Sequence, residues 1–267
     1  MDLFCGAGGL SLGLKEAGFT TLVGADSDPI AIETFVANIG GLGYLGDLSD
    51  VGMFLDHLEA WGINSVDLVA GGVPCQPFSR AGQSKVRSLV QSGLRPKGDP
   101  RTELWRPFVA VVERLNPRMV LLENVPDLAT WREGSVLVGF REQLRKMGYR
   151  THVKILNAFD YGVPQHRARL FVVGTRLEGA FPWPRTWRHR NNLRDAIGDL
   201  PEAPPAQREE SLPYDQPVSP LQKRLRRGVP RDESGKVYDH ITRDIRPDDA
   251  EAFSLLGEGD TYMDLPK

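Results

Sequence analysis

Short apolar runs alternate with longer amphipathic stretches through the first two thirds of the chain. The apolar runs predict buried strands at Thr21–Ala25, Val66–Ala70, Met119–Leu122 and Leu170–Val173. Apolar residues at helical spacing predict helices at Gly9–Ala17, Pro29–Asn38, Leu104–Leu115 and Ser135–Met147. Strands that alternate with helices indicate an α/β fold, with a mostly parallel sheet covered by helices on both faces. Such folds bind ligands at the carboxyl edge of the sheet.

The pattern changes near residue 181. Nine of the 20 prolines lie between Pro182 and Pro230, so regular structure there should be short and broken. The same region carries the basic residues Arg185, Arg188, Arg190, Lys223, Arg224, Arg226 and Arg227. It is either a surface connector with solvated charges or a basic surface beside a nucleic-acid cleft. We therefore expect a ligand-binding catalytic domain over residues 1–180 and a Pro/Arg-rich extension over residues 181–267.

Composition narrows the class of protein. Hydrophobic residues make up 40% of the chain and charged residues 25%, which excludes a wholly disordered chain. A formal net charge of −2 argues against a uniformly basic coat but leaves room for a local basic cleft. No apolar run is long enough for a membrane span, and the N-terminus lacks the features of a signal peptide. The 2 cysteines are too few for a disulfide framework, which favours a reducing cytoplasm.

A glycine-rich turn follows the first predicted strand end, at Asp2–Gly9. Glycines allow a positive φ and let a ligand approach the backbone. The turn lacks the full dinucleotide fingerprint, because Ser11 stands where the third glycine would be. Asp26 follows Gly6 by 20 residues and ends the next strand, a spacing typical of a carboxylate that binds ribose hydroxyls. Together these features favour a nucleoside cofactor over a simple turn.

Cys75 lies in a loop framed by two glycines and two prolines, directly after the predicted strand Val66–Ala70. A cysteine held in such a loop at the ligand edge is a candidate nucleophile. Cys5, under the glycine turn, is interpreted as a packing residue.

Three further charged residues adjoin strand ends. Glu123 ends an apolar strand, where it could handle protons or simply be ion-paired. Arg167 and Arg169 are two positions apart and share one side of an extended chain, as suits a phosphate or a carbonyl oxygen. His166 points the other way and is interpreted as a structural residue.

The residues described so far belong to sequence blocks that occur in a characteristic order. In these blocks and their order the chain resembles the DNA (cytosine-5) methyltransferase family of the bacterial modification type over about residues 1–200. Pro-Cys-Gln followed by Glu-Asn-Val is the most specific part. The matching blocks are Asp2-Leu3-Phe4-Cys5-Gly6-Ala7-Gly8-Gly9, Asp26 with Pro29-Ile30-Ala31, Gly46-Asp47-Leu48, Gly72-Val73-Pro74-Cys75-Gln76-Pro77-Phe78-Ser79, Asp99-Pro100-Arg101 with Leu104, Glu123-Asn124-Val125 and Gln165-His166-Arg167-Ala168-Arg169.

The resemblance implies a Rossmann-like fold with a mixed, mostly parallel sheet. It also implies methyl transfer from S-adenosylmethionine to carbon 5 of cytosine in double-stranded DNA, as part of a restriction-modification system. S-adenosylhomocysteine is then the product, and no metal is needed. The base is flipped into the site. By the same resemblance Cys75 adds to carbon 6, Glu123 acts at ring N3, Arg169 holds O2, and Arg167 supports the site or a phosphate.

Further residues receive roles only through this resemblance. Those expected at the cofactor are Phe4, Gly6, Ala7, Gly8, Gly9, Asp26, Ser27, Asp47, Leu48, Pro74 and Leu104. Those expected at the base are Val73, Pro74, Gln76, Ser79 and Asn124. The loop expected to close over the base carries Arg80, Lys85, Arg87, Arg95 and Lys97 for the DNA backbone. Ser27 replaces a frequent aromatic residue, so the adenine must find another stacking partner.

Two departures from the family pattern limit the expectation. Only Met1 precedes Asp2, and no target-recognition domain or final blocks are visible before Lys267. The chain is then either a fragment or one half of a split enzyme that needs a second polypeptide. In both cases we expect residues 181–267 to lead toward a recognition domain, and we expect the chain alone to bind cofactor and DNA poorly.

Two rival functions stay open. A tRNA cytosine-5 methyltransferase usually carries Cys-Phe-Thr after the Glu-Asn-Val block, and this sequence does not. A non-catalytic subunit would usually lack the nucleophile, whereas Cys75, Glu123 and Arg169 are all present. These features favour a DNA methyltransferase of the bacterial cytoplasm.

Overall fold

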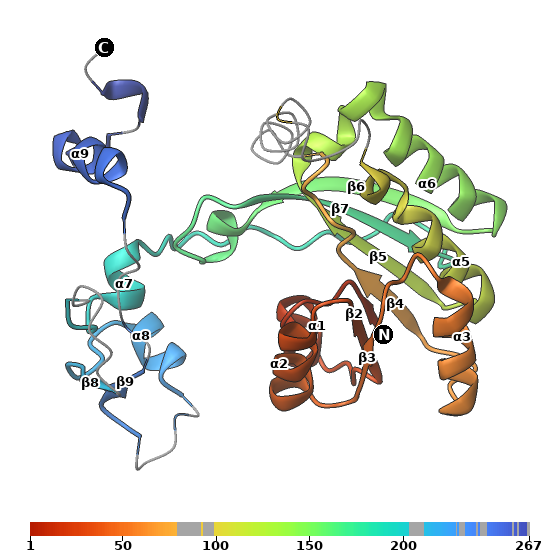
Figure 1. Cartoon of the computed structure of the whole chain (residues 1–267), viewed down its shortest axis with the longest axis horizontal. Coiled ribbons are helices and arrows are strands. Elements are labelled where there is room, and N and C mark those ends of the chain that lie inside the picture. The colour runs from red at the N-terminus through yellow and green to blue at the C-terminus, as the bar shows by residue number, and fades with distance from the viewer. Residues whose placement is uncertain are drawn as a thin grey trace. The chain divides into compact units, whose positions relative to one another are not determined.

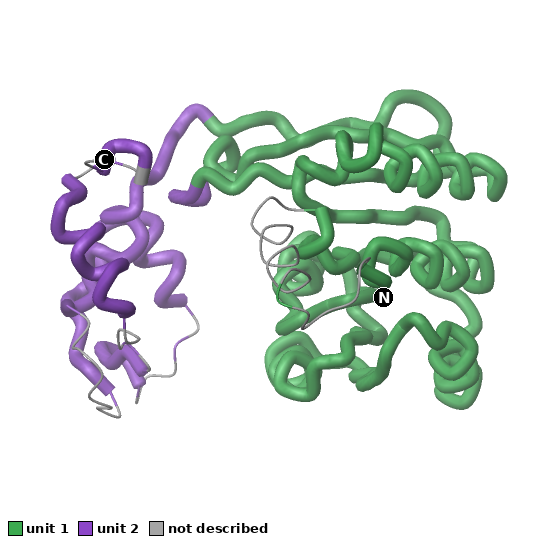
Figure 2. Tube along the Cα trace, turned by 45° about the horizontal axis from the view of Figure 1, so that its top comes forward, with its two compact units in different colours: residues 1–161, 166–187 green, residues 162–165, 188–267 purple. Residues whose placement is uncertain are grey.

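The computed structural model describes residues 1–78, 92, 99–202, 211–227, 229, 233–238, 240, 245–257, 259–260 and 262–265. The chain divides into two compact units (Figure 2). The first contains residues 1–161 and 166–187, and the second contains residues 162–165 and 188–267. Among the described residues, no helix is long and apolar enough to cross a membrane.

The first unit is built on a seven-stranded sheet in the order β3-β2-β1-β4-β5-β7-β6 (Figure 1). Only β7 runs against its two neighbours, and all other neighbouring strands are parallel. The sheet is therefore mixed and mostly parallel, as predicted. The strands are β1 (Asp2–Leu3), β2 (Val23–Asp26), β3 (Leu42–Leu45), β4 (Leu68–Gly71), β5 (Met119–Asn124), β6 (Arg150–Asn157) and β7 (Ala168–Thr175).

Helices cover both faces of this sheet. In Figure 1, α1 and α2 lie on one side, and α3, α5 and α6 lie on the other. Their bounds are α1 (Gly9–Glu16), α2 (Pro29–Ile39), α3 (Val51–Ala60), α5 (Trp105–Leu115) and α6 (Ser135–Lys146). Short 3₁₀ turns connect them at η1 (Pro100–Glu103), η2 (Pro126–Ala129), η3 (Trp131–Gly134) and η4 (Ala158–Tyr161).

All four predicted strands and all four predicted helices are present, with small shifts at their ends. The apolar pattern missed β3, α3 and β6. Both missed strands lie at the edges of the sheet, where burial is incomplete. An edge strand that buries little apolar surface gives a weak pattern of alternation.

The main core lies between the sheet and the helices α3, α5 and α6. Helix α5 buries Trp105, Phe108, Val109, Val111, Val112 and Leu115 along one face. Phe108 meets Phe140 of α6 edge-on, with ring centroids 5.6 Å apart. Each fully buried side chain of this size stabilises the fold by about 1.5–3 kcal/mol. This packing holds the sheet rigid and so fixes where the strands end.

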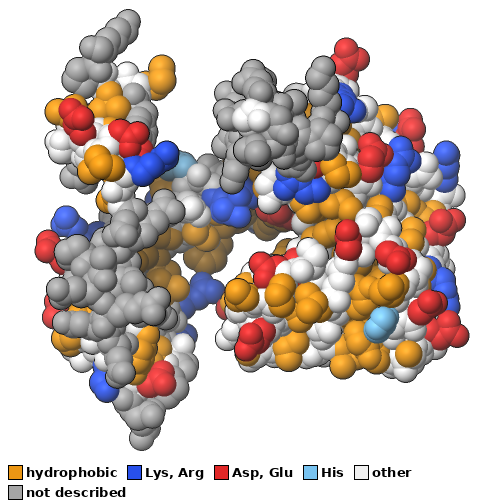
Figure 3. Space-filling view, viewed as in Figure 1, with side chains coloured by type: hydrophobic (Ala, Val, Ile, Leu, Met, Phe, Trp, Pro, Cys, Tyr) orange, Lys and Arg blue, Asp and Glu red, His pale blue; other side chains and the backbone are white. Residues whose placement is uncertain are grey.

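The opposite face of the sheet carries a thinner layer. Helix α2 buries Ile32, Phe35 and Ile39 but leaves Ile30 and Val36 exposed. Figure 3 shows apolar side chains on the surface over the part of the first unit that carries α2 and β3. Single exposed apolar residues of this kind are common on folded proteins.

The second unit contains only short elements, as its prolines predicted. They are α7 (Leu193–Ile197), β8 (Leu212–Pro213), α8 (Pro220–Leu225), β9 (Lys236–Val237), α9 (Pro247–Leu255) and η5 (Tyr262–Asp264). Strands β8 and β9 pair in antiparallel fashion. Both α7 and α8 begin with a capping box, in which the side chain of the cap and that of the third helical residue each accept a backbone N–H.

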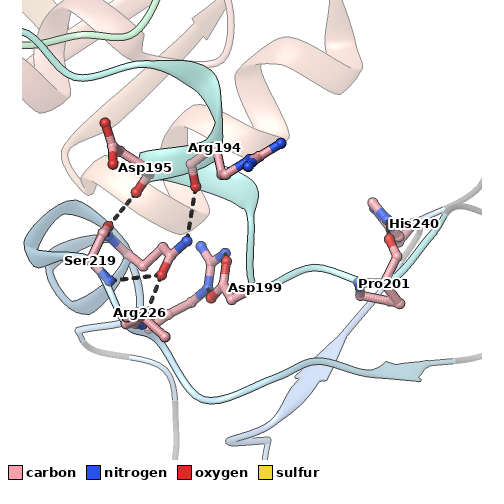
Figure 4. Close-up of polar contacts among 9 residues, drawn as sticks. Arg194, Asp195, Asp199, Pro201, Ser219, Arg226 and His240 are labelled. Atoms are coloured by element: carbon pink, nitrogen blue, oxygen red, sulfur yellow. Dashed lines mark hydrogen bonds and ion pairs between the residues drawn. The ribbon is translucent and has the colours of Figure 1, made fainter.

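Buried polar side chains hold α7 and α8 together (Figure 4). The Gln222 amide accepts hydrogen bonds from Val218 N and Ser219 N and donates to the carbonyl of Arg194 at 3.0 Å. Asp199 is 3% exposed and pairs with Arg226 at 2.7 Å. Such satisfied networks define one arrangement of the segments that they join.

Gly8 provides a test of how the glycine turn is built. It caps α1 with φ 91°, and a Cβ there would lie 2.6 Å from Ile39 Cγ1. We expect Gly8→Ala to lower the free energy of unfolding by about 1–3 kcal/mol, through backbone strain and overpacking. Gly13→Ala is the matched control, because Gly13 lies within α1 with nothing within 4 Å of its added Cβ. The control should be neutral or stabilising by up to about 1 kcal/mol. Urea unfolding followed by circular dichroism measures both, and equal effects would contradict the interpretation.

Candidate active site

A cavity of about 550 Å³ opens where the strands of the first unit end. Its walls come from the ends of β2 and β5, from the segments that follow β1, β3 and β4, and from η1 and the residue after it. This is the carboxyl edge of the sheet, where the sequence predicted a ligand site. The lining residues are Phe4, Asp26, Ser27, Gly46, Asp47, Leu48, Gly72, Val73, Pro74, Cys75, Gln76, Arg101, Leu104 and Glu123.

The glycine turn and Asp26 form one hydrogen-bonded unit. Asp26 Oδ2 accepts from Gly6 N at 2.8 Å, and Asp26 Oδ1 accepts from Asp28 N at 3.0 Å. Each carboxylate oxygen keeps acceptor capacity for a further donor. Phe4 adopts a left-handed conformation with φ 57°, which is unusual for a residue with a bulky side chain. Phe4 lines the cavity, so the strain lies at the candidate site itself.

The next segment along the sheet edge contributes Asp47 and Leu48. Asp47 Oδ1 accepts from Ser49 N at 2.8 Å, which fixes the carboxylate in a tight turn. Leu48 is only 3% exposed and still lines the cavity, together with Leu104. The site thus combines fixed acceptors with an apolar wall, as small-molecule sites usually do.

Cys75 lies in a turn that is anchored just behind it. Phe78 N donates to the carbonyl of Cys75 at 2.9 Å, and the buried Phe78 ring meets Trp131 edge-on at 5.2 Å. The Cys75 side chain is half-buried and lines the cavity. Cys5 is buried against α2, and its burial raises the pKa of its thiol to about 12. Cys5 is therefore the packing residue that the sequence predicted.

Glu123 reaches the same cavity from the end of β5. Arg169 Nε lies 2.9 Å from Glu123 Oε1. A Cβ on Gly72 would lie 3.2 Å from Glu123 Oε2, so a glycine gives this carboxylate its space. Asn124 is 1% exposed and donates from Nδ2 to the carbonyl of Val73 at 2.8 Å. This hydrogen bond ties the Cys75 loop to β5.

The two arginines line a second cavity of about 590 Å³. Phe4, Gly72 and Glu123 line both cavities, so the two adjoin along these residues. Arg167 lines only the second, on the side of Arg169 that the two-residue spacing predicted. His166 does not line either cavity, and its ring lies against Phe159 with centroids 4.3 Å apart.

Arg101 is a cavity residue to which the sequence analysis gave no role. Asp99 Oδ1 accepts from Arg101 Nε at 2.9 Å, and Asp99 Oδ2 accepts from Nη2 at 2.7 Å. Hydrogen bonding to Asp99 raises the pKa of Arg101, and the charge of Cys75 adds to this effect. The signal that could have revealed it is the Asp-x-Arg spacing between the cysteine loop and α5.

Several residues predicted for the site do not line the first cavity. Gly9 lines the second cavity, whereas Gly6, Ala7, Gly8 and Asn124 line neither. Ser79 and the basic loop residues Arg80, Lys85, Arg87, Arg95 and Lys97 lie outside the described residues. Within the described part of the chain, no group of three His, Cys, Asp or Glu residues could hold a metal.

A mixed sheet with one reversed strand, a glycine turn after β1 and an acid after β2 defines a class. It is the Rossmann-like fold of S-adenosylmethionine-dependent methyltransferases. The model of the C-5 cytosine-specific DNA methylase family matches residues 1–246, and the chain belongs to this family.

Individual relatives agree with this family. The Type II methyltransferase M1.HphI of Haemophilus parahaemolyticus is 37% identical over 207 residues, which covers 76% of this chain and 52% of the relative. The Type II methyltransferase M.AquIA of Picosynechococcus is 32% identical over 77% of this chain and 90% of the relative. A crystal structure of a prophage-encoded E. coli protein, described as a DNA modification methyltransferase, has a TM-score of 0.65 and 25% identity, covering 82% of this chain and 60% of that one. The chain spans about half the length of M1.HphI, M.FnuDI, M.XorII and M.AgeI, at 52%, 55%, 46% and 57%.

The buried carboxyl group of Asp2 makes the free energy of unfolding depend on pH. It is 1% exposed, and Oδ2 accepts from Ser11 Oγ at 2.7 Å, while Oδ1 has no hydrogen-bond partner among the described residues. Burial raises the pKa of Asp2 from 3.8 to about 6. The folded state therefore holds a proton that the unfolded state releases. The resulting stabilisation is fully present below pH 3.8 and is lost as the pH rises through about 6.

We expect Asp2→Asn to flatten this dependence. Between about pH 4 and pH 7, the free energy of unfolding of the wild type should fall relative to the variant by up to ~3 kcal/mol. Urea unfolding across this range, followed by circular dichroism, measures the difference. Parallel pH profiles for the two proteins would contradict the assignment.

Proposed function

We propose that the complete protein transfers a methyl group from S-adenosylmethionine to carbon 5 of cytosine in double-stranded DNA, within a restriction-modification system. The observation that carries this proposal is the meeting of Cys75 and Glu123 in one cavity with Asp26 and Asp47. The family and the Type II methyltransferases among its relatives support it. A DNA substrate of this kind implies that the protein works in the bacterial cytoplasm.

The first cavity suits the cofactor in its donor set and its size. Asp26 is a fixed carboxylate with spare acceptor capacity for ribose hydroxyls. Leu48, Leu104 and Pro74 supply apolar surface for the adenine in place of an aromatic residue at Ser27. A volume of about 550 Å³ lies within the usual range for small-molecule sites. S-adenosylmethionine, when bound, supplies the methyl group from its sulfonium.

The proposed work of the protein is to make carbon 5 of cytosine nucleophilic. The Cys75 thiolate adds to carbon 6, and the electron pair of the carbon 5–carbon 6 double bond shifts to carbon 5 and on toward ring N3. Carbon 5 of this enamine-like ring then takes the methyl group, and the sulfonium sulfur keeps the electron pair of the broken bond as a thioether. Glu123 holds a proton at ring N3, which favours this addition. After transfer, the proton on carbon 5 leaves, the double bond re-forms and the Cys75 thiolate is expelled. Each bond made to Cys75 is therefore broken again within one turnover.

The surrounding contacts prepare these two residues. Arg169 holds Glu123 at 2.9 Å and leaves donors for the O2 oxygen of the base. Asn124 fixes the Cys75 loop through the carbonyl of Val73. The carbonyl keeps a second lone pair for the exocyclic amine of cytosine. Carbon 6 is inaccessible within a duplex, so the base must be flipped into the cavity, at a cost of roughly a few kcal/mol.

Trapping of the base tests the nucleophile. Cys75→Ser should abolish methyl transfer, and DNA that contains 5-fluorocytosine should form a covalent adduct only with the protein that retains Cys75, because fluorine blocks the final elimination. Cys5→Ser is the matched control and should keep the adduct, because burial raises the pKa of the Cys5 thiol to about 12 and so keeps it from acting as a thiolate. Denaturing gels and mass spectrometry measure the adduct. Adduct formation by Cys75→Ser would disprove the role, and adducts with tRNA but not DNA would favour the rival substrate.

We also propose that full activity requires a further region, supplied on the same polypeptide or on a second one. The alignment with this chain covers 52% of the length of M1.HphI but 90% of the length of M.AquIA. Some relatives therefore extend well beyond the aligned region, and others do not. This region would carry the reader of the DNA sequence. The extension from residue 181 onward is the proposed approach to it.

Complementation tests this second proposal. The 267-residue chain alone should transfer labelled methyl groups to DNA slowly, and co-expression with a complementing recognition region should restore transfer. Filter-binding assays with labelled S-adenosylmethionine measure the rate. Normal turnover by the 267 residues alone would contradict the proposal.

A further inference from the structure

We propose that Trp131 is a positioning residue for the nucleophile, because it holds the far end of the turn that carries Cys75. The inference deepens the proposed function and rests on it for the reaction, although the contacts themselves depend on no ligand. Trp131 lines neither of the two cavities, so it acts on Cys75 through Phe78. It also lies outside the sequence blocks that carry the family resemblance.

The segment that follows β5 contacts the Cys75 loop at two points. Asn124 Nδ2 donates to the carbonyl of Val73 at 2.8 Å, on the N-terminal side of Cys75. Further along the same segment, the Trp131 ring meets the Phe78 ring at 5.2 Å, on the C-terminal side of Cys75. A loop held at one point can rotate about that contact, whereas contacts on both sides of Cys75 fix where its backbone lies.

Phe78 transmits the second contact to Cys75. The Phe78 backbone N–H donates to the carbonyl of Cys75 at 2.9 Å, which closes the turn between them. The Phe78 side chain is fully buried in the main core. Its ring lies at 84° to that of Trp131, and perpendicular aromatic rings attract each other beyond their apolar burial. A shift of the Trp131 ring would therefore move Phe78, and with it the backbone that carries the sulfur.

A left-handed turn fixes Trp131 itself. Arg132 has φ 45°, Glu133 has φ 60° and Gly134 has φ 77°. Two successive residues with side chains are strained in this conformation, and such strain persists only where the surroundings determine it. The Arg132 guanidinium lies over the Trp131 ring, 4.4 Å from its centroid. The turn also closes tightly on η2, because a Cβ on Gly134 would lie 2.9 Å from the carbonyl oxygen of Ala129.

The proposed reaction depends on where the sulfur lies. Cys75 must reach carbon 6 of the base while Glu123 acts at ring N3, so the two side chains need a fixed separation. Glu123 belongs to β5, and Trp131 belongs to the segment that continues from it. One stretch of chain thus carries Glu123 and both residues that hold the Cys75 loop. A misplacement of about 1 Å in such an arrangement can lower the rate about a hundredfold.

Hydrogen exchange of the Phe78 amide measures this hold without DNA or cofactor. The N–H that donates to Cys75 exchanges with solvent when the turn opens. In the 267-residue chain, we expect Trp131→Leu to speed this exchange about tenfold. Trp131→Phe keeps an aromatic ring and should stay within about threefold of the wild type. NMR resolves the amide, and circular dichroism checks that each variant is folded.

Trp61→Leu is the matched control. Trp61 is also partly buried against the main core, and its ring meets that of His57 edge-on at 5.8 Å, within α3 and the residue that follows it. Its loss should lower stability but leave exchange of the Phe78 amide within about threefold of the wild type. Equal exchange of this amide in folded Trp131→Leu and Trp61→Leu would overturn the inference.

A second pair of variants serves if Trp131→Leu does not fold. Arg132 is exposed, so Arg132→Gln removes the cation from the Trp131 ring at little risk to the fold. Arg106→Gln is its control, because Arg106 lies over the Trp105 ring in the same way, at 4.6 Å. Arg132→Gln should speed exchange of the Phe78 amide about threefold and Arg106→Gln should leave it unchanged. Equal exchange in these two variants would then overturn the inference.

Kinetics separate a positioning role from a purely structural one. With the chain co-expressed with a complementing recognition region, Trp131→Leu should lower kcat for methyl transfer about ten- to a hundredfold. KM for S-adenosylmethionine should stay within about threefold, because Asp26 and Asp47 lie on other segments. Trp131→Phe should recover most of kcat. An unchanged kcat in Trp131→Leu would overturn the inference.

The two readouts also separate this inference from the proposed function. A wild-type protein that transfers no methyl groups even with the recognition region would refute the proposed function. Exchange of the Phe78 amide would still decide whether Trp131 holds the Cys75 turn, because that measurement needs no reaction.

Discussion

The parallel pairing of β4 with β1 and β5 is the constraint on which the site depends. Leu3 is in register with Gly71, and Gly71 with Leu122. The three strands therefore reach the same edge of the sheet. A Cβ on Gly71 would lie 2.2 Å from the carbonyl oxygen of Leu3, so only glycine permits this close approach. The next residues of each chain are then Phe4, the Cys75 loop and Glu123. Segments far apart in sequence thus meet without any need for a long, flexible loop.

Within this frame, each acidic side chain at the candidate site has a fixed partner. Asp26 accepts from two backbone amides, Glu123 pairs with Arg169, and Asp99 holds Arg101. Partly buried carboxylates are costly unless they are paired, so these contacts make an acidic cavity tolerable. They also orient the groups before any ligand binds, which lowers the cost of ordering them during the reaction. The second unit relies on similar polar pairs, such as Asp199 with Arg226, because its proline-rich chain forms only short elements.

The hydrogen bond between Asn124 and Val73 links the fold to the proposed chemistry. Asn124 is buried and lines neither of the two cavities described above, yet it connects the end of β5 to the loop that carries Cys75. Trp131 supports the same loop from the other side through Phe78. The half-buried Cys75 is therefore held by contacts of its loop with β5 and Trp131.

The sequence by itself determined which segments form the buried strands, that an acid ends β2, and that Cys75 and Cys5 lie in different surroundings. These features are local, because a strand end, a glycine turn or a proline-framed loop can be recognised from neighbouring residues. Edge strands β3 and β6 escaped prediction because they bury too little apolar surface to leave a clear pattern. The tertiary structure alone decided that Asn124 ties β5 to the Cys75 loop, that Arg167 lines the second cavity and that Arg101 lines the first cavity together with Cys75. Those placements depend on contacts between residues far apart along the chain, which are fixed only when the sheet assembles.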